Sequence, residues 1–118
     1  MTTQQEEFGR RWIECWNSRD LERILTLYDD DAEMSSPVIV RRGINAEGQV
    51  KGKAALRAYW GRGLKELPDL HFTLLDIFAS PDSLIVRYRN ERGHTICEYL
   101  RLNGEGKIVQ GSANHLVE

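Results

Sequence analysis

Cysteine and histidine are both scarce in this sequence of 118 residues. The two cysteines, Cys15 and Cys97, form no CxxC pair and have no zinc-ligand spacing, and the three histidines are scattered. A tetrahedral zinc site needs clustered cysteine or histidine ligands, so the sequence predicts no metal site. Met1 to Glu7 is polar and acidic, unlike a secretory signal. We therefore expect reduced thiols and a cytoplasmic protein.

Long apolar runs and a large net charge are missing too. No stretch approaches the ~20 apolar residues that cross a bilayer, and the net charge is -2. Basic residues cluster at Arg10–Arg11, at Arg41–Arg42 and over 87–92, which favours a solvated surface over a phosphate site. Neither nucleic acid nor a membrane is expected as a partner.

The composition is otherwise that of an ordinary globular domain, with 41% hydrophobic and 29% charged residues. A chain of 118 residues suits one domain. Because the sequence has no internal repeat, linker or low-complexity stretch, residues 1–118 are predicted to form a single domain.

Three segments in the first part of the chain have the apolar spacing of helices. The first covers 6–16. The second starts at the N-cap Asp20, has Tyr28 as its last apolar position and ends at the acidic run 29–31. The third covers 53–67 and stops before Pro68. Between them, a short strand is predicted over 32–36 and another at 38–40, joined to the rest of 38–52 as a hairpin with a loose loop.

The second half of the chain has the pattern of strands. Segments 70–79, 83–90, 95–102 and 107–117 are separated by turn sequences, among them Asn103-Gly104-Glu105-Gly106. Four strands joined by short turns predict an antiparallel meander. Early helices and a late meander together predict an α+β fold.

Four segments of the sequence resemble one superfamily. They are WNSRDLERILTLYDDDAEMSSP, GKAALRAYWGRGL, PDLHFTLLDIF and CEYLRLNGEGKIVQGSANH. Their order is similar to that in nuclear transport factor two-like proteins, in the branch of SnoaL-like polyketide cyclases and ketosteroid isomerases. The resemblance implies a cone-shaped, curved antiparallel sheet wrapped around N-terminal helices, a cystatin-like roll with an apolar pocket inside. It also implies a homodimer through the outer face of the sheet.

Glu98 is an acid on an otherwise apolar strand face, with Ile96, Leu100 and Leu102. It could form a salt bridge at a sheet edge, or the strand phase could be reversed so that Glu98 faces outward. Alternatively it is a pocket carboxyl, whose pKa burial would raise and whose neutral form would donate a hydrogen bond to an oxyanion. By resemblance, Glu98 occupies the position of the protonated aspartate of ketosteroid isomerases.

The other isomerase positions differ in this sequence. Ser36 stands where the resemblance places the general-base aspartate, and a serine hydroxyl is a poor base for carbon acids. Trp12 and Trp60 replace two tyrosines, whereas Tyr28 matches a supporting tyrosine. Turnover of Δ5-3-ketosteroids is therefore not expected.

His115 is the second candidate for catalysis, because histidine is an acid or base near neutral pH. On the closing strand it shares a face with Val109, Gly111 and Ala113, and the small residues would leave open volume beside it. It could form an acid–base pair with Glu98, or it could be an ordinary surface histidine.

Several residues are predicted to line the pocket, and an aromatic lining suits a small hydrophobic, cyclic ligand. The aromatic residues could equally be plain core. The predicted ligand-binding set is Trp12, Trp16, Tyr28, Ser36, Trp60, Val86, Tyr88 and Ala113.

The relatives that hydrolyse epoxides need an Asp–Arg–Asp set. Asp76 and Arg87 are present, but the strand phase around His71 and Asp76 is not settled by the pattern, and Arg87 is predicted to face outward.

Two functions are consistent with these features. The first is a pocket protein that converts a small hydrophobic molecule by acid–base chemistry without a cofactor, as an isomerase, cyclase or dehydratase. The second is a non-catalytic binding or interaction module of the same fold. A third possibility is an accessory domain that works in a complex, for which the partner surface would be the sheet face with Arg87, Arg89, Cys97, Tyr99 and Arg101.

Overall fold

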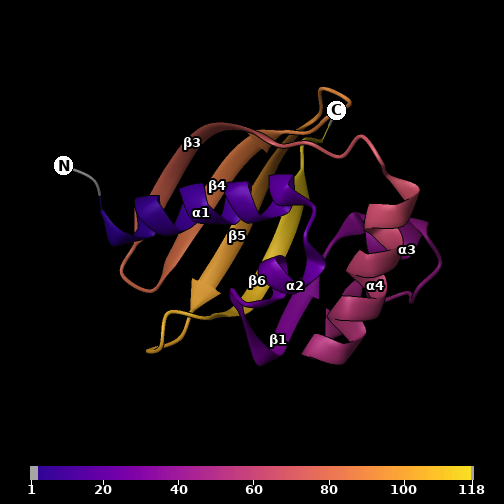
Figure 1. The fold of residues 1–118 in the computed structure, drawn as a ribbon, viewed down its shortest axis with the longest axis horizontal. Coiled ribbons are helices and arrows are strands. Elements are labelled where there is room, and N and C mark those ends of the chain that lie inside the picture. Colours follow the sequence, from indigo (N-terminus) through magenta and orange to yellow (C-terminus); the bar gives the residue numbers. More distant parts are fainter. Residues whose placement is uncertain (1–2, 118) are drawn as a thin grey trace.

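A curved six-stranded sheet with helices on one of its faces makes up residues 3–117, which the computed structural model describes (Figure 1). In chain order the elements are α1 (Gln4–Ser18), α2 (Leu21–Leu25), β1 (Tyr28–Ser35), α3 (Pro37–Arg41), β2 (Gln49–Lys51), α4 (Lys53–Glu66), β3 (Thr73–Ser80), β4 (Ser83–Arg89), β5 (Thr95–Leu102) and β6 (Ile108–His115). The α+β fold class predicted from the sequence is confirmed.

The strand order in the sheet is β2-β1-β6-β5-β4-β3. Strands β3 to β6 form the predicted antiparallel meander. β1 pairs antiparallel with β2 but parallel with β6. The parallel pair of β1 and β6 brings together an early and a late segment of the chain. Parallel strands are connected by a long crossover, so no local sequence pattern predicts this pairing.

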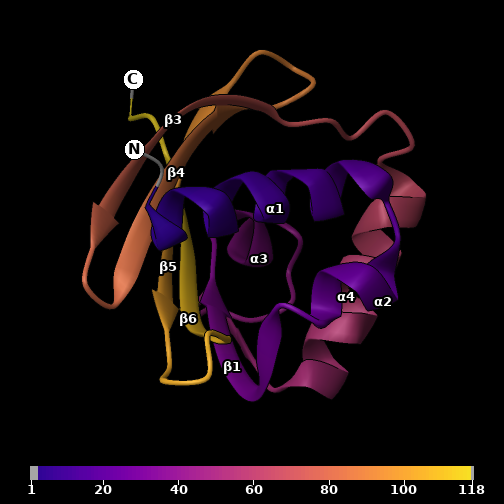
Figure 2. The same ribbon diagram turned by 60° about the vertical axis from the view of Figure 1, so that its left-hand side comes forward.

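The helices cover one face of the sheet, which curves around α1 (Figure 2). Strand alternation sets this face: Leu84, Val86 and Tyr88 of β4 are buried, as the sequence predicts, and Ile85 points to the other side. Helix α1 approaches the sheet closely at Gly9, where an added Cβ would lie 2.8 Å from Ile77. A glycine in a helix is unfavourable, so close packing accounts for it here.

The segment after β1 is a short helix, so the strand predicted over 38–40 is wrong. Ser36 is the N-cap of α3, and its Oγ accepts a hydrogen bond from the Val38 N–H at 3.2 Å. Pro37 occupies the first helical position, where its fixed φ is favourable. These start signals outweigh the strand propensity of Val38-Ile39-Val40. Of the predicted hairpin, only β2 is a strand, and it pairs antiparallel with β1.

The second helix is shorter than predicted, because α2 ends at Leu25 and Tyr28 already belongs to β1. The acidic run 29–31 falls where the β1–β6 register shifts between Tyr28 and Glu33. Carboxylates are tolerated there because Asp30 and Asp31 are exposed. Strand β3 likewise starts at Thr73 rather than at residue 70, so 67–72 is a loop.

Within residues 3–117, no helix is both long and apolar enough to cross a membrane. The cytoplasmic location stays a prediction.

Candidate functional site

A pocket lies between the helices and the sheet, with a cavity volume of about 180 Å³. Cavities of ~150 Å³ can bind benzene, so this pocket has room for a small ring. The pocket is lined on the helical side and its loops by Trp12, Trp16, Val38, Arg42, Tyr59, Trp60, Gly63, Leu64, Leu67, Leu70 and Phe72. On the sheet side and its turns it is lined by Met34, Ser36, Tyr88, Asn90, Glu91, Ile96, Glu98, Ala113 and His115.

Aromatic rings make up much of the wall. Trp16 and Trp60 meet edge to face with ring centroids 5.1 Å apart. Phe72 lies 4.2 Å from Tyr88 between ring centroids. Two hydrogen bonds fix the loop that carries this ring: Asn17 Nδ2 donates to the Phe72 carbonyl oxygen at 2.9 Å, and the Phe72 N–H donates to Asn17 Oδ1 at 2.8 Å. The wall therefore offers stacking faces to a flat apolar ligand.

Glu98 lies on a central strand and is 2% exposed. Its Oε1 accepts a hydrogen bond from the Tyr88 hydroxyl at 3.0 Å, while Oε2 has no partner within residues 3–117. Burial raises the pKa of the carboxyl from 4.5 to about 7, and the Tyr88 hydrogen bond opposes that rise. Glu98 makes no ion pair with any residue in 3–117. The edge salt bridge considered from the sequence is therefore wrong, and Glu98 is a pocket carboxyl.

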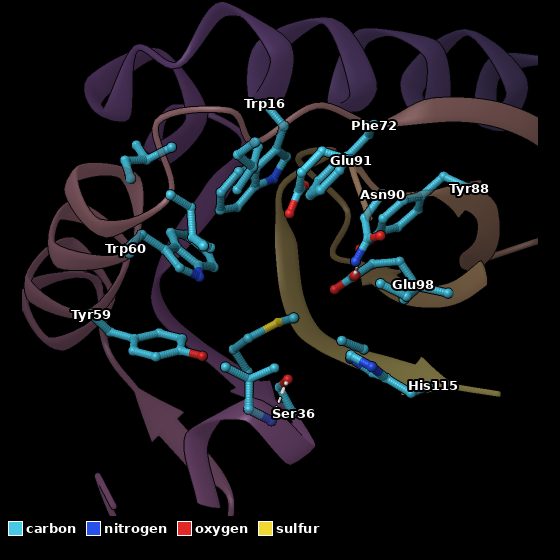
Figure 3. Close-up of a pocket in the computed structure, with 18 of the residues that line it drawn as sticks. Trp16, Ser36, Tyr59, Trp60, Phe72, Tyr88, Asn90, Glu91, Glu98 and His115 are labelled. Carbon is cyan, nitrogen blue, oxygen red and sulfur yellow. Dashed lines mark hydrogen bonds between the residues drawn. The ribbon is translucent and has the colours of Figure 1, made fainter. Parts of the chain in front are cut away.

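His115 lies on β6 and lines the same pocket as Glu98. In the β5–β6 pairing Glu98 faces Ala113 and Ile96 faces His115, so the two side chains are diagonal neighbours on one sheet face. Figure 3 shows both on the same side of the cavity. Burial, with the nearby charges of Arg41 and His94, lowers the pKa of His115 below 6.5. No direct hydrogen bond joins His115 to Glu98 within 3–117.

Ser36 and Trp12 both line the pocket, but their polar atoms are used in local structure. The Ser36 hydroxyl caps α3. The indole Nε1 of Trp12 donates to the Tyr28 hydroxyl at 2.9 Å. Ser36 therefore has a structural task at the position where the related isomerases keep a base.

Two of the predicted ligand-binding residues lie behind the pocket wall. Tyr28 is 2% exposed and Val86 is fully buried, and neither is among the lining residues. Burial, followed by the charge of Glu98, raises the pKa of Tyr28, so this phenol stays neutral. The structure brings the other predicted site residues together: Trp12, Trp16, Ser36, Trp60, Tyr88, Glu98, Ala113 and His115.

Two buried polar atoms of the lining residues have no hydrogen-bond partner within 3–117: Trp16 Nε1 and Glu98 Oε2. Trp16 lies near the Tyr28 hydroxyl and helps to lower its pKa, without the geometry of a hydrogen bond. Leaving such groups unpaired costs ~1–3 kcal/mol each. A ligand that hydrogen-bonds to them would recover that cost.

Gly111 does not line the pocket, contrary to the expected open volume beside His115. An added Cβ at Gly111 would lie 2.9 Å from the Met34 sulfur, so the methionine fills this space. The strand phase around Asp76 is also settled: Asp76 pairs with Arg87 by two hydrogen bonds of 2.8 and 2.6 Å on the face away from the helices. His71 is exposed before β3.

Several lining residues were not predicted: Arg42, Tyr59, Phe72, Asn90 and Glu91. Only Tyr59 could have been found from the sequence, because it belongs to the apolar stripe of α4. The others lie in loops and turns, where no periodicity indicates direction. The structure shows no cluster of three or more potential metal ligands among residues 3–117.

Comparisons with known proteins assign the family. A profile of the SnoaL-like domain matches residues 9–111. A SnoaL-like protein of unknown function from Burkholderia thailandensis E264 is 35% identical, with a TM-score of 0.90, and the match covers 99% of this chain and 100% of that one. No curated protein matches this sequence significantly.

More distant structures share the fold. A SnoaL-like family protein from Agrobacterium tumefaciens C58, named as a proposed isomerase, is 17% identical with a TM-score of 0.77 and coverage of 98% and 100%. TerC, crystallised with polyporic acid, is 16% identical with a TM-score of 0.79 and coverage of 97% and 92%. Other similar structures are described as nuclear transport factor 2-like or cystatin-like. The chain belongs to the SnoaL-like domain family and has the cone-shaped fold that the sequence predicted.

Proposed function

We propose that this protein binds a small, cyclic, largely apolar carbonyl compound and moves a proton on it without a cofactor. The observation that carries the proposal is the buried Glu98 carboxyl, which lines the pocket with one oxygen unpaired within 3–117. A group in this position contacts a ligand that fills the cavity. Isomerisation, cyclisation and dehydration all use such a proton transfer.

Glu98 is the proposed acid. With a pKa of about 7, a large fraction of the carboxyl is protonated at neutral pH. A protonated carboxyl in an apolar site donates a hydrogen bond to a carbonyl oxygen, and this bond strengthens as the oxygen becomes an enolate. The Tyr88 hydroxyl holds Oε1, so Oε2 is the atom that meets the ligand.

His115 is the proposed base. Its lowered pKa keeps the imidazole neutral at pH 7, and a neutral imidazole accepts a proton. Because His115 and Glu98 are not hydrogen-bonded to each other within 3–117, they act on different ligand atoms. His115 takes a proton from the carbon next to the carbonyl while Glu98 gives its own proton to the carbonyl oxygen, so the products are an enol, a protonated His115 and an ionised Glu98.

The relatives support a ligand of this kind. TerC was crystallised with polyporic acid, and another similar structure, from Sinorhizobium meliloti, is named as a proposed polyketide cyclase. The aromatic wall of Trp16, Trp60 and Phe72 supports a flat ring.

The test is exchange of the carbon-bound α-protons of 2-tetralone for deuterium, followed by proton NMR in D2O. The wild type should accelerate exchange above the buffer rate, and Glu98→Gln or His115→Ala should remove ~10²-fold or more of that rate. Glu91→Gln is the matched control, because it removes another carboxyl that lines the pocket but is exposed. Its exchange rate should stay close to that of the wild type. Exchange at the buffer rate in the wild type would contradict the proposal.

A non-catalytic binding module is the second candidate, and the Ser36 cap favours it because no base stands at that family position. In that case 2-tetralone binds, with Glu98 and Trp16 as hydrogen-bonding groups, but does not exchange. Binding without exchange therefore separates the two functions.

A homodimer through the outer sheet face is part of the proposal. Phe78 is 55% exposed and Ile85 is 36% exposed on β3 and β4, away from the helices. Apolar side chains on an uncovered sheet face suit an interface.

A further inference from the structure

Arg42 and Tyr59 bring polar groups to the pocket wall on the side of α3 and α4. Arg42 follows α3 and is half-buried, with 24% of its side chain exposed. Tyr59 lies on α4 and its hydroxyl points into the cavity (Figure 3). Neither residue belongs to the proposed proton-transfer pair, so their presence needs a separate explanation.

Charge on this side of the pocket is not balanced. Within residues 3–117, Arg42 pairs with one carboxylate, that of Glu66, at 2.7 Å. Glu66 also pairs with Arg62 at 2.8 Å. Two guanidinium groups therefore share a single carboxylate, and the group of three has a net charge of +1. A guanidinium has five N–H donors, so donors of Arg42 are left for another partner.

The neighbouring groups add to this positive field. Arg41 is exposed and makes no ion pair within 3–117. Its positive charge acts to lower the pKa of both Tyr59 and His115. Arg42 and Arg41 oppose the rise that burial causes in the pKa of Tyr59. Of the acidic groups at the pocket, Glu66 is shared between two arginines, burial raises the pKa of Glu98 to about 7, and Glu91 is an exposed carboxyl in the turn after β4, on the sheet side of the lining.

The Tyr59 hydroxyl makes no hydrogen bond to any side chain or backbone group within 3–117. A phenol that faces a cavity beside a guanidinium is a good donor to an anion, because the cation holds the anion in place. Tyr59 and Arg42 come from two elements, both line the same pocket, and the charge of Arg42 acts to lower the pKa of the Tyr59 hydroxyl.

We propose that Arg42 and Tyr59 form an anion subsite at the pocket and that the ligand carries a carboxylate there. This inference rests on the proposed function and names its substrate class: a small ring against Trp16 and Trp60, a carbonyl at Glu98, and a carboxylate at Arg42. The carboxylate would orient the ring so that one carbonyl meets the acid.

Calorimetric titration with two matched probes tests the subsite. The probes are 2-naphthaleneacetate and its uncharged amide, 2-naphthaleneacetamide. The wild type should bind the carboxylate roughly tenfold or more tightly than the amide. In Arg42→Gln this preference should disappear while the amide binds as before, and Tyr59→Phe should reduce it.

Arg62→Gln is the matched control, because Arg62 pairs with the same Glu66 but does not line the pocket. The preference should persist in Arg62→Gln. Equal affinity of the wild type for both probes would overturn the anion subsite and leave the apolar pocket standing. Failure of both probes to bind would overturn the pocket and the subsite together. A preference that survives in Arg42→Gln would also overturn the assignment.

Discussion

The Tyr88 hydroxyl donates a 3.0 Å hydrogen bond to Oε1 of Glu98, whereas Oε2 of the same carboxyl has no partner within 3–117. One oxygen is thus positioned by the protein, and the other is the oxygen that the proposed function assigns to the ligand. The burial that raises the pKa of Glu98 to about 7 makes this group sensitive to pH in the physiological range.

Glu98→Gln should change how stability depends on pH. The pKa of Glu98 is raised in the folded state, so ionisation favours unfolding. Its neutral form is fully compatible with the fold below about pH 4.5, and stability falls as the pH rises from there through about 7. Between pH 4 and pH 8, the unfolding free energy of the wild type should fall by at most about 3 kcal/mol relative to that of Glu98→Gln.

The measurement for Glu98→Gln is urea unfolding of both proteins across that pH range. Glutamine keeps an acceptor for the Tyr88 hydroxyl, so the hydrogen bond itself is not removed. A difference that does not vary with pH would contradict the raised pKa.

Tyr88→Phe should raise the pKa of Glu98 further. The hydrogen bond from Tyr88 is the one influence that lowers this pKa, and phenylalanine removes it while it keeps the buried ring. The carboxyl signal in 13C-glutamate NMR should titrate at higher pH than in the wild type. The expected cost in stability is ~1 kcal/mol. An unchanged or lower titration midpoint would be evidence against the hydrogen bond.

Ser36→Ala should reduce stability by ~1 kcal/mol, because it removes the N-cap of α3. Ser36→Asp should keep the stability of the wild type, since aspartate is an equally good N-cap. Thermal unfolding of the two variants gives the comparison, and equal stability of Ser36→Ala and the wild type would show that the cap is dispensable.

A Δ5-3-ketosteroid should not be turned over by the wild type. The Ser36 hydroxyl is engaged as a cap, so it is not available as a base at the family position. The assay follows absorbance of the conjugated product against a buffer blank. Turnover well above the blank would mean that another group acts as the base.

Ile85→Lys should weaken the proposed dimer, because it places a charge on the outer face of β4. Ile44→Lys is the matched control: Ile44 is similarly exposed at 41% but lies in the loop between α3 and β2. Light scattering after size exclusion should give a dimer for the wild type and the control and a monomer for Ile85→Lys. A monomeric wild type would rule out the dimer.

The strand phases of β4 and β5 could be predicted because alternation has a fixed period of two. It placed Tyr88 and Glu98 on the buried face, and both are there. The same reasoning failed at 38–40, where a capping serine and a proline determine the backbone more strongly than strand propensity does. At Gly111 the predicted face is correct, because Gly111 pairs with the buried Leu100, but Met34 from a strand far away in sequence fills the expected open volume.

The sequence by itself determined the fold class and the apolar strand face that Glu98 shares, because these depend on residue types and local periodicity, and its resemblance to ketosteroid isomerases indicated that Ser36 stands at the position of the family base. The tertiary structure alone decided that Tyr28 and Val86 lie behind the pocket wall and that Arg42 and Tyr59 line it. It also decided that Glu98 has one satisfied oxygen. The physical reason is that distances between side chains from separate elements depend on packing and on the parallel β1–β6 pairing, which no local pattern records.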